Sequence, residues 1–199
     1  MTYKEQKFTI PTLKGISSKN IEEHLKLYTG YVKHANLIKT QVAELLKEGE
    51  KNTYLIGELN RRFGFEFDGM RNHEFYFRSL EGGSVALTPE GDLMKAISAQ
   101  WESFEAFLAQ FKGIALTRGI GWAVLYFDPK EKALITAWVE EQHLGHLVGL
   151  IPVLMLDMWE HSFVADYQPS GKKQYVEDFF SNLNWSVIEE NYAHALMAK

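Results

Sequence analysis

The stretch Leu156-Asp157-Met158-Trp159-Glu160-His161 decides how the rest of the chain is organised. An apolar run from Leu147 to Leu156 leads directly into the aspartate, and a histidine follows four residues later. Polar groups buried beside so much apolar surface are costly unless each has a partner. Asp157 and His161 can be two ligands of one metal ion, and such a pair suits Mn, Fe or Zn. The simpler interpretation is a buried hydrogen bond between the two, so the positions of the other histidines matter.

The composition is that of a globular protein. The chain has 199 residues, of which 46% are hydrophobic and 14% aromatic, which is enough for a real core and argues against disorder. There is no cysteine, which excludes disulfides, thiolate metal sites and a cysteine nucleophile. The net charge is −5 and no basic patch dominates, so we expect no nucleic-acid partner. Without a signal-peptide core or an apolar run of about 18 residues, we expect a cytoplasmic protein that does not contact membranes.

The first half of the chain is predicted to be helical. After an extended arm over residues 1–16, Ser17 or Ser18 can cap a helix that runs from about residue 20 to 47, with His24 one turn inside it. A second helical stretch is predicted over residues 53–80. Its middle is broken by glycines and can kink there, and its later part sets His73 among aromatic residues. The two stretches predict a helical hairpin.

The second half is predicted to be mixed. Thr88 as N-cap and Pro89 at the first helical position predict a helix over 89–99, and a second amphipathic helix follows over 102–117. Strands are predicted at 121–127, 133–138 and 147–156, and helices at 172–182 and 184–198. The fold class is therefore α+β, with an N-terminal α-hairpin unit over residues 1–87 and a C-terminal α/β unit over residues 88–199.

The ligand candidates are divided between the two units. His24 and His73 belong to the first, and Asp157 and His161 belong to the second. Sites between units are common places for chemistry. A metal held there would also fasten the units together.

Several motifs in the sequence resemble those of a known family. Residues 157–161 resemble the D-x-W-E-H motif of the iron/manganese superoxide dismutases, and residues 72–77, Asn-His-Glu-Phe-Tyr-Phe, resemble their N-H-x-x-Y-W segment. The pairs at 121–122, 151–152 and 184–185 follow in the family's order and at fitting separations. The chain is similar to this family over nearly its whole length.

The resemblance implies a fold, an activity and a cofactor. In the family, an N-terminal helical hairpin and a C-terminal α/β domain with a three-stranded antiparallel sheet hold one Mn or Fe ion per subunit. The ion converts superoxide anion to dioxygen and hydrogen peroxide. By motif match, its ligands here are His24, His73, Asp157 and His161. Family members are dimers or tetramers, so a homodimer or homotetramer is expected, in which Glu160 matches the glutamate that contacts a ligand histidine across the interface.

This sequence departs from the family pattern around the first helix. The family's H-x-x-x-H-x-x-x-Y becomes His24, Tyr28 and Tyr31, with the last tyrosine one residue early. We assign Tyr31 as the tyrosine at the entrance of the site and keep Tyr28 as the alternative. Val164 stands where a tyrosine usually pairs with the missing histidine across the dimer, so the dimer contact is expected to differ. Phe77 replaces a common tryptophan near the metal.

The residue that hydrogen-bonds the metal-bound solvent in the family is also implied by position. Iron-type members often supply it from four residues before the second ligand histidine, which here is Gly69. Manganese-type members supply it from the loop before the third strand, where Gln142 stands, with His143 as the alternative. This arrangement favours Mn. Trp122, Trp159 and Phe77 are expected to line the cavity, and the nearest cations for attracting an anion are Lys172 and Lys173.

Two other functions stay open. Two histidines with Asp157 could form a 2-His-1-carboxylate iron site for oxygenase-type chemistry. Alternatively, the chain is a metal-binding protein of this fold that has lost dismutase activity, which the altered tyrosines favour. A redox-inert Zn ion would not support dismutation.

Overall fold

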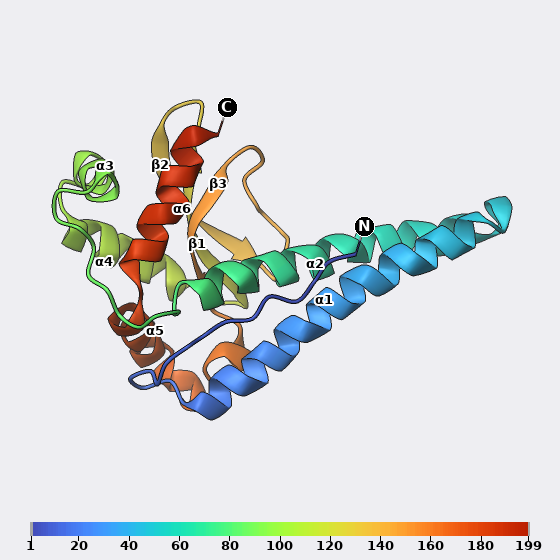
Figure 1. Ribbon diagram of the computed structural model, residues 1–199, viewed down its shortest axis with the longest axis horizontal. Coiled ribbons are helices and arrows are strands. Elements are labelled where there is room, and N and C mark those ends of the chain that lie inside the picture. The colour runs from blue at the N-terminus through green and yellow to red at the C-terminus, as the bar shows by residue number, and fades with distance from the viewer. Residues whose placement is uncertain (1, 199) are drawn as a thin grey trace.

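The computed structural model describes residues 2–198 and has the α+β architecture that the sequence predicts (Figure 1). Short 3₁₀ turns lie at Gly49–Asn52, Glu160–Ser162 and Pro169–Gly171. The main elements are α1 (Ser18–Leu46), α2 (Thr53–Arg78), α3 (Asp92–Trp101), α4 (Phe104–Ala115), β1 (Gly121–Asp128), β2 (Ala133–Glu140), β3 (Ile151–Asp157), α5 (Lys172–Asn182) and α6 (Trp185–Met197).

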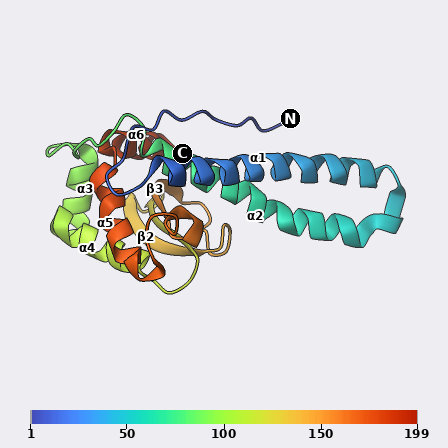
Figure 2. The ribbon, with the colours of Figure 1, turned by 90° about the horizontal axis from the view of Figure 1, so that it is seen from below.

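Helices α1 and α2 form a long antiparallel hairpin that projects from the rest of the molecule (Figures 1 and 2). The Ser17 hydroxyl caps α1 by accepting a hydrogen bond from the backbone amide of Asn20. Buried residues of α1 recur with the helical period, from Ile21 through Val32 to Ile38. Helix α2 is continuous across Gly64 and Gly69, so the predicted glycine break does not occur.

The sheet has the order β2-β1-β3, with both pairings antiparallel. The central strand β1 is buried along nearly its whole length, as expected for a strand covered on both faces. Its register places Trp122 opposite Asp157, the last residue of β3. Because α2 packs against β3, the end of that strand meets the base of the hairpin.

Two predicted boundaries are wrong. The helix predicted at 89–99 begins at Asp92, because Thr88 does not cap it. The Thr88 hydroxyl instead donates a hydrogen bond to the Glu189 carboxylate on α6, at 3.0 Å. The backbone carbonyl of Thr88 accepts a hydrogen bond from the Gly91 amide, which closes a turn. The third strand begins at Ile151 and not at residue 147, since the first part of the apolar run is an exposed turn in which Val148 is 99% exposed.

The N-terminal arm lies along the hairpin in an extended conformation (Figure 1). Tyr3 exchanges two hydrogen bonds with the Asn36 side chain, at 2.8 and 2.9 Å, and the Gln6 amide donates to the Tyr28 hydroxyl at 2.8 Å. Phe8 packs edge-on against Tyr28. The arm therefore covers part of the hairpin near its base. Among the described helices, none is long and apolar enough to cross a membrane.

Candidate metal centre

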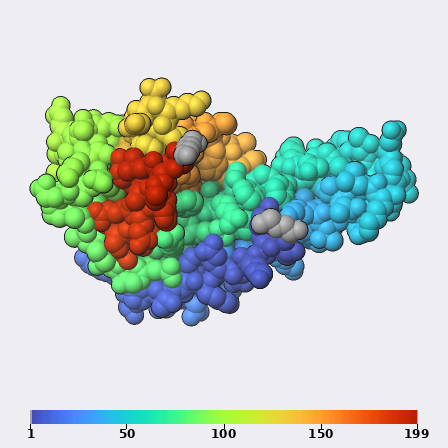
Figure 3. All heavy atoms as spheres, turned by 45° about the horizontal axis from the view of Figure 1, so that its top comes forward, coloured from blue at the N-terminus to red at the C-terminus, as the bar shows by residue number. Residues whose placement is uncertain are grey.

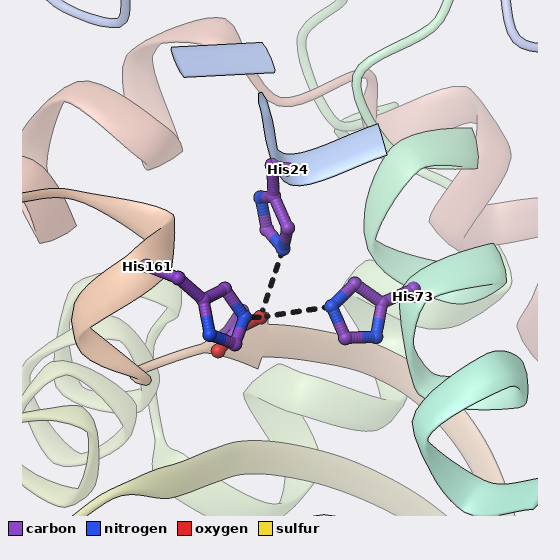
Figure 4. A group of neighbouring side chains, drawn as sticks. His24, His73 and His161 are labelled. Atoms are coloured by element: carbon purple, nitrogen blue, oxygen red, sulfur yellow. Dashed lines mark hydrogen bonds and ion pairs between the residues drawn. The ribbon is translucent and has the colours of Figure 1, made fainter. Parts of the chain in front are cut away.

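Three histidines and one aspartate from four separate segments converge on one point (Figure 4). The Nε2 atoms of His24, His73 and His161 lie 3.0, 3.5 and 3.1 Å from one oxygen, Oδ2 of Asp157. The four donor atoms all lie within 4.8 Å of one another. His24, His73 and Asp157 are fully buried, whereas the side chain of His161 is 20% exposed. The structure thus brings together the four residues that the sequence singled out.

The fold fixes each of these side chains. His24 lies near the start of α1, His73 near the end of α2, and His161 in the 3₁₀ turn that follows β3. The other carboxylate oxygen of Asp157 accepts a hydrogen bond from the Trp159 backbone amide at 2.8 Å. That bond orients the carboxylate, so that Oδ2 faces the imidazoles. The Asp157 carbonyl accepts from the Tyr175 hydroxyl at 3.0 Å, which ties the end of β3 to α5.

The electrostatics of the cluster favour neutral imidazoles at His24 and His73 and an ionised carboxylate at Asp157. Burial lowers the pKa of His24, and burial together with the neighbouring His24 lowers the pKa of His73 to about 3. Burial alone would raise the pKa of Asp157, but the imidazoles of His161 and His24 outweigh it and hold that pKa well below its usual range. Neutral histidines and a carboxylate are the forms that bind metals.

The orientation of His73 shows that the cluster fits a cation. Its Nδ1 lies 2.5 Å from the Gly69 carbonyl, so Nδ1 carries the hydrogen and Nε2 presents a lone pair. That Nε2 is buried without a hydrogen-bond partner in the described part of the chain, and it faces a carboxylate oxygen. Two electron-pair donors pointing at each other are unfavourable unless a cation lies between them. Three imidazoles and one carboxylate suit Mn or Fe.

A hydrogen-bonded chain lies beside this cluster. The Trp122 indole donates to Oε1 of Gln142 at 3.0 Å, and Nε2 of Gln142 donates to the Tyr31 hydroxyl at 3.0 Å. Gln142 is fully buried, and the Tyr31 ring lies 5.1 Å from that of His73. Burial raises the pKa of Tyr31 well above its ordinary value, with Asp157 adding to the shift, so its hydroxyl keeps its proton.

Tyr31 fills the place that a side chain at position 69 would need. A Cβ added to Gly69 would lie 2.6 Å from Cδ1 of the Tyr31 ring, which is closer than real Cβ atoms come. Helix α1 is a regular α-helix between His24 and Tyr31, and this spacing carries the ring over Gly69. Position 69 must therefore be glycine for the Tyr31 ring to pack where it does.

The alternative candidates lie elsewhere. Tyr28 is fully buried, but its hydroxyl is turned toward Gln6 and Glu74. His143 packs its ring 5.7 Å from Phe65, and its Nδ1 has no hydrogen-bond partner among the residues described. The structure therefore places Tyr31 and Gln142 beside the cluster, and not Tyr28 and His143.

The remaining predicted residues surround the cluster or face outward. The Phe77 ring lies 4.8 Å from His24, and the Trp159 ring is stacked 5.7 Å from His161 while its indole donates to the Glu141 carbonyl. Glu160 is exposed in the single chain. Lys172 donates to the Thr117 carbonyl at 3.0 Å, and burial lowers its pKa.

The sequence patterns do not connect three polar residues with Gln142. Asn72 donates to the Gln142 carbonyl at 2.9 Å, and its place directly before His73 is a signal that could have identified it. Tyr126 lies within the predicted strand over residues 121–127, and His146 lies in the loop after β2. Their contacts depend on how the loop after β2 folds back, which the sequence pattern does not show.

Comparisons with known proteins agree with this geometry. Residues 89–191 match the family described as iron/manganese superoxide dismutases, C-terminal domain. A manganese superoxide dismutase of Mycolicibacterium fortuitum is 35% identical over 175 residues, which cover 86% of this chain and 82% of that protein. One from Nocardia asteroides is 32% identical over 87% of this chain and 82% of its own length. A mitochondrial one from Glossina morsitans morsitans is 32% identical over 92% of this chain and 84% of its own.

The matches to the relatives extend beyond residues 89–191, since they cover 86% and 92% of this chain. From the motifs, the fold and these similarities together, the chain belongs to the iron/manganese superoxide dismutase family.

Proposed function

We propose that this chain is a superoxide dismutase that holds one Mn or Fe ion with His24, His73, Asp157 and His161. The single observation that carries the proposal is the convergence of three imidazole Nε2 atoms on Asp157 Oδ2 inside a buried site. The lone pair of His73 directed at that carboxylate supports a cation there. The same proposal places the ion between the α-hairpin unit, residues 1–87, and the α/β unit, residues 88–199.

The ion, when bound, supplies the one-electron reduction and oxidation that dismutation of superoxide requires. The chain's own residues supply the surroundings. Asp157 and the three histidines hold the ion. The Trp159 amide fixes the direction of the Asp157 carboxylate, and the Gly69 carbonyl fixes that of the His73 imidazole. Phe77 and Trp122 keep bulk water out of the site, since both are fully buried.

Protons for the peroxide product are delivered through Tyr31. Tyr31 is partly exposed, so its hydroxyl can exchange protons with solvent, and its raised pKa keeps it protonated at neutral pH. Gln142 donates to the Tyr31 oxygen and accepts from Trp122, so the amide is held in one orientation. We assign Tyr31 to proton delivery and Gln142 to holding the hydrogen-bond network beside the ion.

Mn is the proposed metal. The three relatives compared above are named manganese superoxide dismutases. The glutamine of this site comes from the loop before β3, and the position on α2 that could supply another is blocked by Tyr31 over Gly69.

The chain is proposed to work as a homodimer or homotetramer. Glu160 and Val164, the positions that correspond to dimer contacts in the family, are exposed in the single chain. His161 between them is partly open to solvent. A second copy seated there would complete the burial of this ligand.

The test is superoxide consumption per bound metal atom, measured on protein loaded separately with Mn and with Fe. High activity with Mn and one ion per chain is the expected result. Comparable activity with both metals would make the enzyme able to use either. Tight binding of both metals without activity would contradict the dismutase assignment and favour a metal-binding protein of this fold.

A further inference from the structure

The loop between β2 and β3 holds Gln142 by its backbone as well as by its side chain. Two side-chain donors converge on the Gln142 carbonyl, Nδ2 of Asn72 at 2.9 Å and Nε2 of His146 at 3.3 Å. Asn72 comes from α2 and His146 from the loop itself, so the carbonyl is held from two sides. The position of the Gln142 amide beside Tyr31 depends on these anchors.

The Tyr126 hydroxyl and the Gln142 carbonyl together fix which nitrogen of His146 carries the proton. The Tyr126 oxygen lies 2.6 Å from Nδ1 of His146, and Nε2 of His146 lies 3.3 Å from the Gln142 carbonyl. A carbonyl oxygen can only accept a hydrogen bond, so Nε2 carries the hydrogen of the neutral ring. Nδ1 then presents a lone pair and accepts the hydrogen of the Tyr126 hydroxyl. Burial lowers the pKa of His146, which keeps the ring neutral.

Tyr126 lies on β1 beside an irregularity in the sheet. The pairing of β1 with β3 shifts its register between Leu125 and Tyr126, because Val153 of β3 is an extra residue between the partners Leu154 and Pro152. Such bulges often lie next to active sites. Tyr126 is only 1% exposed, and its ring meets that of His146 at 86°, with centroids 6.2 Å apart. The pair is thus a packed, hydrogen-bonded unit that contacts the backbone carbonyl of Gln142.

We propose that Tyr126 and His146 are positioning residues that hold Gln142 in the orientation the site needs. This inference rests on the proposed function, because the side chain that they position is the one that bridges Trp122 and Tyr31. Neither residue belongs to the group of four metal-binding candidates. They act through the Gln142 backbone, and their removal lets the amide move away from Tyr31.

The experiment compares three substitutions in the Mn-loaded full chain. His146→Leu removes the donor, His146→Gln keeps an N–H at similar reach, and Tyr126→Phe removes the hydroxyl that selects the tautomer. His194→Leu, at an exposed histidine of α6, is the matched control. The readouts are dismutase activity per bound Mn, the midpoint potential of the bound metal and its visible absorption spectrum.

His146→Leu is expected to lower activity per bound metal by about tenfold, as losing an outer hydrogen-bond partner commonly does, and to change the potential and the spectrum. His146→Gln is expected to recover most of the wild-type values. The activity per bound metal of Tyr126→Phe is expected to lie between those of His146→Leu and His146→Gln, because the imidazole can then take either tautomer. An unchanged potential and spectrum in His146→Leu would overturn the proposal, and so would His146→Gln behaving like His146→Leu.

A second measurement does not depend on activity or on how the variants fold. In the wild-type chain without metal, ¹⁵N chemical shifts of His146 are expected to show a proton on Nε2 and none on Nδ1. The opposite tautomer would overturn the proposal by itself. If the wild-type, metal-loaded chain has no dismutase activity, the proposed function fails, and the tautomer result still reports separately on the Tyr126–His146 pair.

Discussion

The base and the tip of the α1–α2 hairpin belong to the same two helices but differ in what surrounds them. At the base, His24, Tyr28, His73 and Phe77 are all fully buried. At the tip, the hairpin stands away from the rest of the molecule (Figure 3), and Tyr54 is 84% exposed. Helix formation alone therefore does not explain the precision of the site.

The difference lies in the origin of the stabilising contacts. Near the tip they are local, such as the exposed ion pair between Lys47 and Glu44 three residues apart, which contributes little. At the base they are long-range, such as His24 meeting Asp157 and Tyr31 meeting Gln142. Substitutions should accordingly have large effects at the base and small effects at the tip.

The largest effect is expected where the hairpin base meets β3. Asp157→Asn keeps the shape but removes the negative charge that the three imidazoles face. Metal affinity should fall by more than the roughly 10–100-fold typical of losing an outer partner. Metal content after dialysis against a chelator measures this, with Asp128→Asn, at the last residue of β1, as the control. Retention equal to wild type would remove Asp157 from the ligand set.

The next effect is the pH dependence of the metal-free protein. The unfolded chain protonates His73 near pH 6.5, whereas the folded pKa is about 3, so between these values the unfolded state binds more protons. Stability should therefore fall as pH falls below about 6.5, by about 1.4 kcal/mol per pH unit for this histidine. His24, whose pKa is also lowered, adds in the same direction. Urea denaturation at pH 7 and pH 5 tests this, and equal midpoints would contradict it.

Substitutions of two glycines on α2 allow a direct comparison of stability effects at the base and nearer the tip. Gly69→Ala places a methyl group against the Tyr31 ring, so a destabilisation of about 1–3 kcal/mol and a loss of activity are expected. Gly57→Ala, nearer the tip, meets nothing within 4 Å and should stabilise the helix by up to about 1 kcal/mol. Thermal denaturation of both variants checks the pair. A Gly69→Ala variant as stable as wild type, or more stable, would show that the packing of Tyr31 over Gly69 is looser than described.

A smaller effect is expected from the hydroxyl that ties the N-terminal arm to the base. Tyr28→Phe removes the acceptor for the Gln6 amide and the donor to Glu74, and should cost about 1 kcal/mol of unfolding free energy. Urea denaturation of the metal-loaded protein measures this loss. A change below about 0.3 kcal/mol would indicate that the arm is not held by this contact.

The smallest effect is expected at the tip itself. Tyr54→Ser removes an 84% exposed side chain, and the free energy of unfolding should change by no more than about 0.5 kcal/mol. The same denaturation assay applies. A larger destabilisation would mean that the tip takes part in contacts beyond the single chain, such as those of an oligomer.

Much of the fold was predictable because local patterns and tertiary packing agree. The helical period of α1 and the strand pattern of β1 gave their elements within a few residues. The predicted start of a helix at Pro89 was wrong because a distant residue, Glu189, holds Thr88 in a turn. The apolar residues at 147–150 resemble a strand, but Gly149 has φ +85° and the segment turns in solvent.

Part of the candidate site was also predictable from the sequence, and part was not. The residues that the motifs contain, from His24 to His161, were all indicated by the sequence, and the structure brings them together. The contacts that orient Gln142 were not predicted, since they join Asn72 on α2, Tyr126 on β1 and His146 in a loop. Such contacts depend on side-chain directions at positions far apart in the chain, which neither periodicity nor motif spacing encodes.

The most direct test of the proposed metal site is the position of the metal itself. Crystals of the Mn-loaded protein, measured on both sides of the Mn absorption edge, would give an anomalous difference map that locates the ion. We expect one peak per chain, enclosed by Nε2 of His24, His73 and His161 and by Oδ2 of Asp157. A peak at any other place, or full Mn content with no peak inside this cluster, would contradict the proposed metal site.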